Sequence, residues 1–189
     1  ELLLINAEGN NLLLAIRIRQ QKKADIYITA MSARDLINKS DAYTWSEMRL
    51  DGYQRKLRPQ DISKLSEFLI RGGILPTSIL VSVEKIVLGK EKRVDNTLSI
   101  AKIDPKGVMW IVDGQRRVEG LRQLLGREQS FQEFPIPICL FVSPNRTYEM
   151  EQFYVVNRRQ KSVPTDLAQQ ILYQDYSRSP TEFFNFLNR

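Results

Sequence analysis

Apolar and polar residues repeat along the chain with two different periods, and each period predicts one type of secondary structure. Alternation every second residue, flanked by turn residues, predicts strands at 12–19, 26–29, 78–84, 98–103, 108–112 and 136–142. The prolines in the last of these indicate an edge strand or a strand start. Between two of the strands, the polar and charged stretch 89–97 is expected to form a hairpin loop.

Apolar residues at helical spacing predict helices at 59–71, 115–125 and 147–157. The first of these helices is expected to stop at Gly72 and Gly73, because glycine favours the backbone conformation that ends a helix. Its expected buried stripe consists of Ile62, Leu65, Phe68 and Leu69.

Shorter helices are expected to open at Ser32 and, from a capping-box pattern, at Ser179. Strands and helices alternate irregularly, which favours a compact α+β domain over a doubly wound sheet. We expect an N-terminal strand and helix extension over 1–49, a core domain over 50–175 and the start of a C-terminal helical region over 176–189. The chain starts without methionine and ends inside an apparent helix, so we expect a fragment of a longer protein.

Composition narrows the functional classes. The 189 residues are 42% hydrophobic, which suffices for a folded core, and no apolar run is long enough to span a membrane. The start has no signal-peptide pattern, so a cytoplasmic location is expected. The absence of histidine excludes a Ser-His-Asp triad, a Cys-His pair and a His-ligated zinc site within this chain. The single cysteine, Cys139, lies in an apolar run and is expected to be buried and inert, and the net charge of +6 modestly favours a polyanionic partner.

The segment 113–117 is the leading candidate for a functional site. An apolar run ends at Asp113 and Gly114, and Gln115, Arg116 and Arg117 then open a helix. A helix start offers unpaired N–H groups and the positive end of a dipole, so the residues from Gly114 to Arg117 are expected to bind phosphate. At 3.6 residues per turn, Arg117 lies beside the apolar stripe and Arg116 points the opposite way. The alternative makes Asp113 a helix N-cap and Arg117 a member of a structural ion pair.

Two further segments are candidates for anion binding. The segment 51–55 echoes 113–117, so Gln54 and Arg55 are candidates for phosphate binding, with a surface turn as the alternative. The second segment lies at a predicted helix end and is basic and rich in amides. Either it contacts DNA, or its cations simply stabilise the helix by interacting with the helix dipole. It consists of Asn157, Arg158, Arg159, Gln160 and Lys161.

The segment 113–117 resembles the signature of the bacterial DGQHR-domain proteins, which include the DndB group, with Arg116 in place of the usual histidine. Further blocks look like those of the family in order, at 52–55, 74–83 and 157–164, so the resemblance covers roughly 50–172. The family is similar to the ParB/sulfiredoxin-like superfamily, which implies a small mixed sheet flanked by helices, here with an N-terminal strand extension. Gln115 stands where sulfiredoxins carry their catalytic cysteine, so their chemistry is not expected.

The resemblance implies a DNA-binding regulator of transcription in a bacterial DNA-modification system, of the phosphorothioation type, or in a defence system. Double-stranded DNA is the expected partner, with a nucleotide and a second copy of the chain as further possibilities. The alternative is an NTPase for ATP, GTP or CTP, in which Asp113 or Glu119 would hold Mg²⁺ or orient water. A nuclease component is a weaker alternative. The sequence has no Walker loop and no acidic cluster for two metals, so no metal is expected outside the NTPase alternative.

Overall fold

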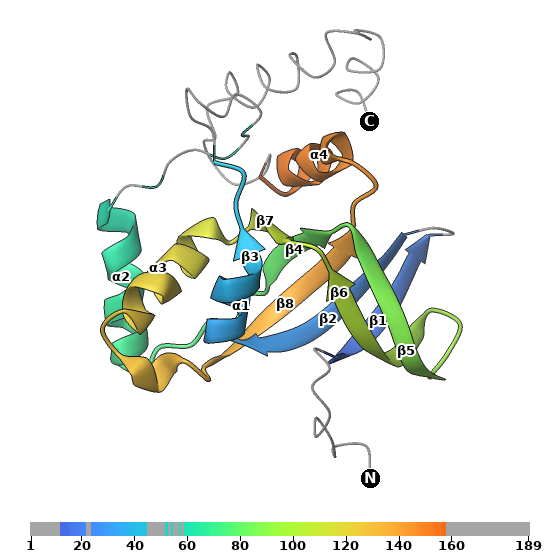
Figure 1. Ribbon diagram of the computed structural model, residues 1–189, viewed down its shortest axis with the longest axis horizontal. Helices are drawn as coiled ribbons and strands as arrows, with labels where there is room; N and C mark the ends of the chain where they lie inside the picture. The colour runs from blue at the N-terminus through green and yellow to red at the C-terminus, as the bar shows by residue number, and fades with distance from the viewer. Residues whose placement is uncertain are drawn as a thin grey trace, which may run out of the picture.

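The computed structural model describes residues 12–21, 24–44, 52, 54, 57 and 59–157 (Figure 1). The strands are β1 (Leu13–Gln21), β2 (Ala24–Ser32), β3 (Ser40–Asp41), β4 (Ile79–Val83), β5 (Lys85–Arg93), β6 (Leu98–Lys106), β7 (Met109–Asp113) and β8 (Pro135–Val142). The helices are α1 (Ala33–Lys39), α2 (Pro59–Ile70), α3 (Gln115–Leu125) and α4 (Arg146–Asn157), with a short 3₁₀ turn, η1, at Gln129–Phe131. The expected α+β class is therefore confirmed.

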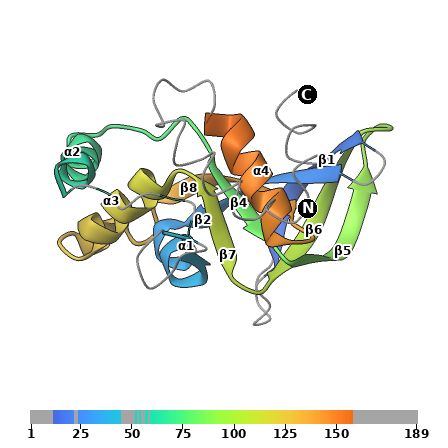
Figure 2. The ribbon, with the colours of Figure 1, turned by 90° about the horizontal axis from the view of Figure 1, so that it is seen from above.

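The eight strands form one mixed sheet in the order β3-β7-β4-β8-β2-β1-β6-β5. The pairs β3–β7 and β4–β8 are parallel, and the other neighbours are antiparallel. Only Glu84 separates β4 from β5, although these strands stand third and last in the sheet. Likewise, only Gly107 and Val108 join β6 to β7. The sheet therefore curls until its two halves meet at these links (Figure 2).

A glycine is required at one of these links. Gly107 has a φ of +81°, a conformation that side-chain-bearing residues rarely adopt. A Cβ atom added there would lie 3.4 Å from the carboxyl group of Glu84, so the two links run side by side. This close approach holds β5 and β6 against the ends of β4 and β7.

The main core lies between one face of the sheet and helices α1 and α3. Val81 and Leu140 of the sheet are fully buried there with Leu36 of α1 and Leu121 of α3. Side chains alternate between the two faces of a strand, so the neighbours of these strand residues point to the other face. On that face α4 packs, through an edge contact between Phe141 and Tyr148 and a buried hydrogen bond from Ser82 Oγ to the carboxylate of Glu149.

Helix α2 packs on α3 rather than on the sheet. A Cβ atom at Gly120 would lie 2.7 Å from Leu65 Cδ2, so glycine permits the close approach of the two helices. The Ser66 hydroxyl donates a hydrogen bond of 3.1 Å to the Gly120 carbonyl. The sequence-based prediction for the end of α2 is confirmed, since Gly72 has a φ of +87° and Gly73 N donates to the Phe68 carbonyl.

The structure differs from one expectation about strands, and it decides between the two alternatives of another, since β8 starts at Pro135. The region 89–97 was expected as a loop, but its first half belongs to β5, which pairs with β6 along the open edge of the sheet. All residues of β5 except Ile86 are exposed, so no apolar alternation marks the strand. Strand β8 lies inside the sheet rather than at its edge. Its prolines, Pro135 and Pro137, are tolerated because they pair with β2 alone, and β4 begins to pair only at Ile138.

Two side chains are less buried than expected. Phe68 is 50% exposed, because its ring lies over Gly73 instead of entering the core; a Cβ atom at Gly73 would lie 2.4 Å from that ring. Cys139 is half-buried, and this burial raises the pKa of its thiol, which keeps it unreactive.

Within the described residues, no helix is long and apolar enough to cross a membrane. The predicted domain boundaries stay predictions.

Candidate phosphate and nucleic-acid binding sites

The turn from β7 into α3 depends on one glycine. Gly114 is the N-cap residue of α3 and has a φ of +98°. A Cβ atom there would lie 2.6 Å from Ile79 Cδ1 and 3.0 Å from a terminal nitrogen of Arg117, so no larger residue fits without displacement. Asp113 makes no side-chain cap for the helix, and the N-cap alternative for this residue was wrong.

The side chain of Arg117 makes its hydrogen bonds and its ion pair within the protein. Its Nη1 donates to the Thr77 carbonyl at 2.7 Å, to the Thr77 hydroxyl at 2.6 Å and to the Ser78 carbonyl at 3.1 Å. Its Nη2 forms an ion pair with Asp113 at 3.1 Å. Burial lowers the pKa of the guanidinium, and the charge of Asp113 opposes this effect. The structure therefore contains the ion pair of the structural alternative, and Arg117 ties the turn to the chain that enters β4.

Arg116 is placed differently from its neighbour. Its side chain is exposed, as the helical geometry predicted. Among the described residues it has no hydrogen bond and no ion pair, whereas Arg117 uses its guanidinium within the fold. Arg116 is therefore the cation of this turn that is available to a ligand.

Gln54 and Gln115, one from each of the two similar segments, are linked through Thr44. The buried side chain of Gln54 donates a short hydrogen bond to the Ile111 carbonyl in β7. Thr44 pairs with Gln54 in an isolated parallel bridge, and the Thr44 hydroxyl accepts a hydrogen bond of 3.0 Å from Gln115. Both glutamines thus join the loop segments to the turn, with their amides directed at protein groups. Arg55 lies outside the described residues.

The predicted catalytic carboxylates do not form a metal site. Asp113 is paired with Arg117, and Glu119 forms an ion pair with Arg122 three residues along α3. Over the described part of the chain, no group of three or more Asp, Glu, Cys or His residues is arranged to hold a metal ion. Asp113 and Glu119 are instead each paired with an arginine of the same helix or turn.

The predicted DNA-binding segment is described only at its first residue. Asn157 ends α4, and its side-chain amide donates a hydrogen bond of 2.7 Å to the Phe153 carbonyl one turn earlier. Arg158, Arg159, Gln160 and Lys161 lie outside the described residues, so this candidate site stays a prediction.

Sequence reasoning missed a basic surface that the sheet assembles from two distant segments. We call strands β1, β2, β5 and β6, with the loop that joins β5 to β6, the basic wing; its described residues are 13–21, 24–32 and 85–106. In the sequence, the segment 13–32 has four Lys or Arg residues, of which Lys22 and Lys23 lie outside the described residues, and one Asp, and the segment 85–106 has six Lys or Arg and three Asp or Glu. Each segment therefore has a net charge of +3, and together they account for the whole net charge of +6.

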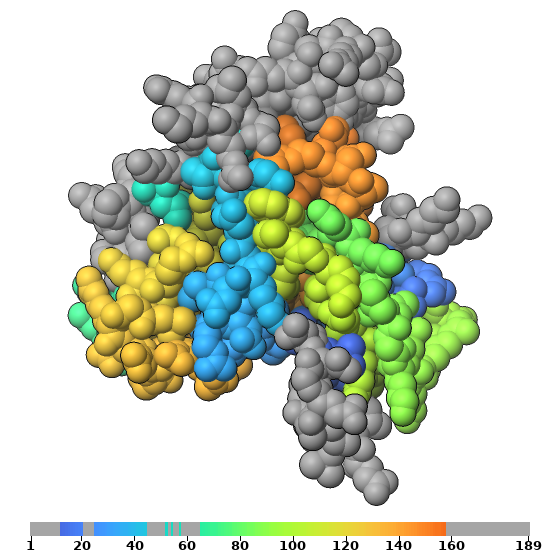
Figure 3. Space-filling model, in the orientation of Figure 1, coloured from blue at the N-terminus to red at the C-terminus, as the bar shows by residue number. Residues whose placement is uncertain are grey.

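Strands β5 and β6 of the basic wing lie away from helix α3. Figure 3 shows the green and yellow-green strands β5 and β6 on the flank opposite the yellow helix α3. Pairing of β1 with both β2 and β6 unites the two charged segments. A count of charge in windows along the sequence would have found each segment, but not their adjacency.

A comparison with protein-family models matches residues 13–181 to a family described as DndB, DNA-sulfur modification-associated. No curated protein and no solved structure matches the chain. The fold similarity to the ParB/sulfiredoxin-like superfamily therefore stays a prediction.

Proposed function

The chain belongs to the DndB family of DNA-sulfur modification-associated proteins, and from this we propose that it is a DNA-binding regulatory component of a bacterial DNA phosphorothioation system. The observation that carries the proposal is the basic wing, whose described residues place a net charge of +4 on one half of the curled sheet. Duplex DNA is a polyanion whose phosphates attract such a one-sided surface. The regulatory role rests on the resemblance to the DGQHR-domain proteins.

The shape of the basic wing supports contact with a duplex. Strand β5 has nine residues, and at the usual rise per residue it is about 27 Å long. Lys90, Lys92 and Arg93 are exposed along this edge strand. Cations on this open edge of the sheet would meet DNA phosphates, which fix the position of a protein on the duplex.

The test compares two charge-reversal pairs. Lys90→Glu with Lys92→Glu changes the basic wing, and Arg71→Glu with Arg127→Glu changes the net charge equally at exposed positions on the helical side. Fluorescence anisotropy titrations with a labelled duplex are run at several salt concentrations. We expect the wing pair to weaken binding and to lower the slope of log affinity against log salt by about 1 for each DNA phosphate that the protein no longer neutralises. The control pair should retain most of the affinity.

An equal loss in both pairs would mean that the overall charge of the chain, and not the basic wing, governs binding. Failure of the unaltered chain to bind any duplex would overturn the proposed function. A regulatory role further requires that an operator duplex from the modification genes binds more tightly than an unrelated duplex, since phosphate contacts alone carry no sequence information.

We keep nucleotide binding at the β7–α3 turn as a second proposal, because Arg116 is exposed at the start of α3 and has no partner among the described residues. ATP, GTP or CTP would raise the melting temperature of the chain, and Arg116→Ala would abolish the rise. A melting temperature that no nucleotide changes would contradict this second proposal.

A further inference from the structure

A cavity of about 290 Å³ lies at the end of the basic wing, between β1, β5 and the loop that joins β5 to β6. Three guanidinium groups, from Arg17, Arg19 and Arg93, line it. Backbone pairing holds the loop against β1, since Arg19 N donates to the Thr97 carbonyl at 2.8 Å. The cavity thus lies on the surface that we propose binds DNA.

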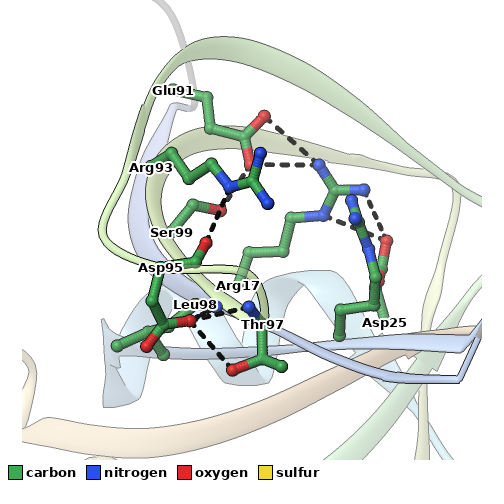
Figure 4. A network of polar contacts seen from close by, with 9 residues as sticks. Arg17, Asp25, Glu91, Arg93, Asp95, Thr97, Leu98 and Ser99 are labelled. Carbon is green, nitrogen blue, oxygen red and sulfur yellow. Dashed lines mark hydrogen bonds and ion pairs between the residues drawn. The ribbon is translucent and has the colours of Figure 1, made fainter.

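The floor of the cavity is a rigid polar network (Figure 4). Arg17 donates to Asp25 at 2.6 Å and 3.0 Å and to both carboxylate oxygens of Glu91 at 3.0 Å and 3.2 Å, and its side chain is only 16% exposed. The hydrogen bond from Ser99 and the pairing with Arg17 lower the pKa of Glu91. Both carboxylates are therefore already occupied by donors from the protein.

The loop at the rim is equally well ordered. Oδ1 of Asp95 accepts hydrogen bonds from the Thr97 amide, the Thr97 hydroxyl and the Leu98 amide at 2.6–2.9 Å. Arg93 donates through Nε to the Asp95 carbonyl and through Nη2 to the Asn96 side chain, both at 2.7 Å. These contacts fix the direction of the Arg93 guanidinium before any ligand arrives, which reduces the entropic cost of binding.

Unused hydrogen-bond donors remain around the cavity. Arg19 has one weak ion pair, from Nε to Asp25 at 3.7 Å, and among the described residues its two terminal nitrogens have no partner. The same holds for Nη1 of Arg93 and for the side-chain amide nitrogen of Asn96. Most hydrogen-bond acceptors around the cavity already have donors, whereas several donors have no acceptor; this is the binding capacity that remains. A ligand that supplies only acceptor oxygens matches this capacity.

We propose that this cavity binds a single phosphodiester group of the DNA backbone, held between the guanidinium groups of Arg19 and Arg93 on the base formed by Arg17, Asp25 and Glu91. The inference rests on the proposed function, because the duplex delivers the phosphate. The charged side chains at the cavity balance one another, three arginines against three carboxylates. Attraction therefore comes from directed donors and the surrounding basic wing, which favours a phosphodiester within a bound duplex over a free phosphate ion.

The test uses substitutions that keep the charge and remove only the planar fork of donors. Arg19→Lys and Arg93→Lys are compared with Arg127→Lys, the same exchange at an exposed position outside the basic wing. Lysine offers a point charge where arginine offers paired donors, so each wing variant should bind a duplex about five- to tenfold more weakly, with the control unchanged. Melting temperatures are measured for all three, and Arg19→Lys is the decisive variant because Arg19 supports no loop contact through its side chain.

The outcomes separate the two proposals. If the unaltered chain binds no duplex, the proposed function fails. A second outcome is that the chain binds a duplex and the charge reversal of Lys90 and Lys92 weakens this binding, but Arg19→Lys and Arg93→Lys bind as tightly as the unaltered chain. In that case the cavity is not a phosphate site, and the basic wing acts by charge alone. Weaker binding by Arg19→Lys, with an unchanged melting temperature, supports the site.

Discussion

Replacing Arg117 by alanine should destabilise the fold, although this residue occupies the centre of the predicted phosphate site. The substitution removes three hydrogen bonds to Thr77 and Ser78 and the ion pair with Asp113. A buried hydrogen bond to a charged group contributes about 1.5–3 kcal/mol, and the partial exposure of this cluster reduces the total. We therefore expect a loss of roughly 2–3 kcal/mol in the free energy of unfolding, rather than the sum of the separate interactions.

The neighbouring arginine supplies a matched control. Arg116→Ala removes the same charge from the same helix turn, but from an exposed side chain without a partner among the described residues, so its effect should stay within about 0.5 kcal/mol. Urea unfolding followed by circular dichroism measures both variants. For a chain of this size, the expected loss in Arg117→Ala lowers the melting temperature by about 5–10 °C. Equal melting temperatures for the two variants would refute the structural role that we assign to Arg117.

Two further predictions concern the packing of α2 on α3 and the network under the cavity. Gly120→Ala should lower the free energy of unfolding, because a methyl group 2.7 Å from Leu65 forces the helices apart at a cost of about 1–3 kcal/mol. This cost exceeds the stabilisation that the higher helix propensity of alanine provides. A higher melting temperature in this variant would contradict the prediction. Ser99 and then Arg17 lower the pKa of Glu91, so its contribution to stability is present above the unfolded pKa and is lost as the pH falls through the folded pKa. Glu91→Gln should accordingly destabilise the chain at neutral pH and less so near pH 3 in urea titrations, whereas a loss independent of pH would show that the charge is not involved.

Local signals in the sequence explain which elements could be predicted. Helix 115–125 was predicted at both ends, because its apolar stripe and the following Gly126 are contained within the segment. Strand β5 could not be predicted in the same way. It is stabilised by backbone pairing with β6, and its exposed side chains follow no apolar alternation.

The sequence grouped the segments of the candidate site but did not predict their contacts. The similarity of 51–55 to 113–117 grouped the two segments, and the structure brings Gln54 against β7. Two partners of Arg117, Thr77 and Ser78, lie 40 and 39 residues upstream, and the resemblance of 74–83 to a family block did not indicate that they bind this side chain. The basic wing could not be predicted from the sequence for a similar reason, since only the pairing of β1 with β6 brings its two segments together.

The order of the strands also sets when each part of the chain is able to fold. The hairpin of β1 and β2 lies between β8 and β6, so these two strands pair with strands that are synthesised much later. The sheet remains incomplete until Val142, the last residue of β8, has been synthesised. Such distant pairing slows folding and leaves Ala15, Tyr27 and Met31, which are buried in the complete sheet, exposed in the nascent chain. Protection of this hairpin from aggregation during synthesis, by a chaperone or by low temperature, should therefore determine how much folded protein a cell yields.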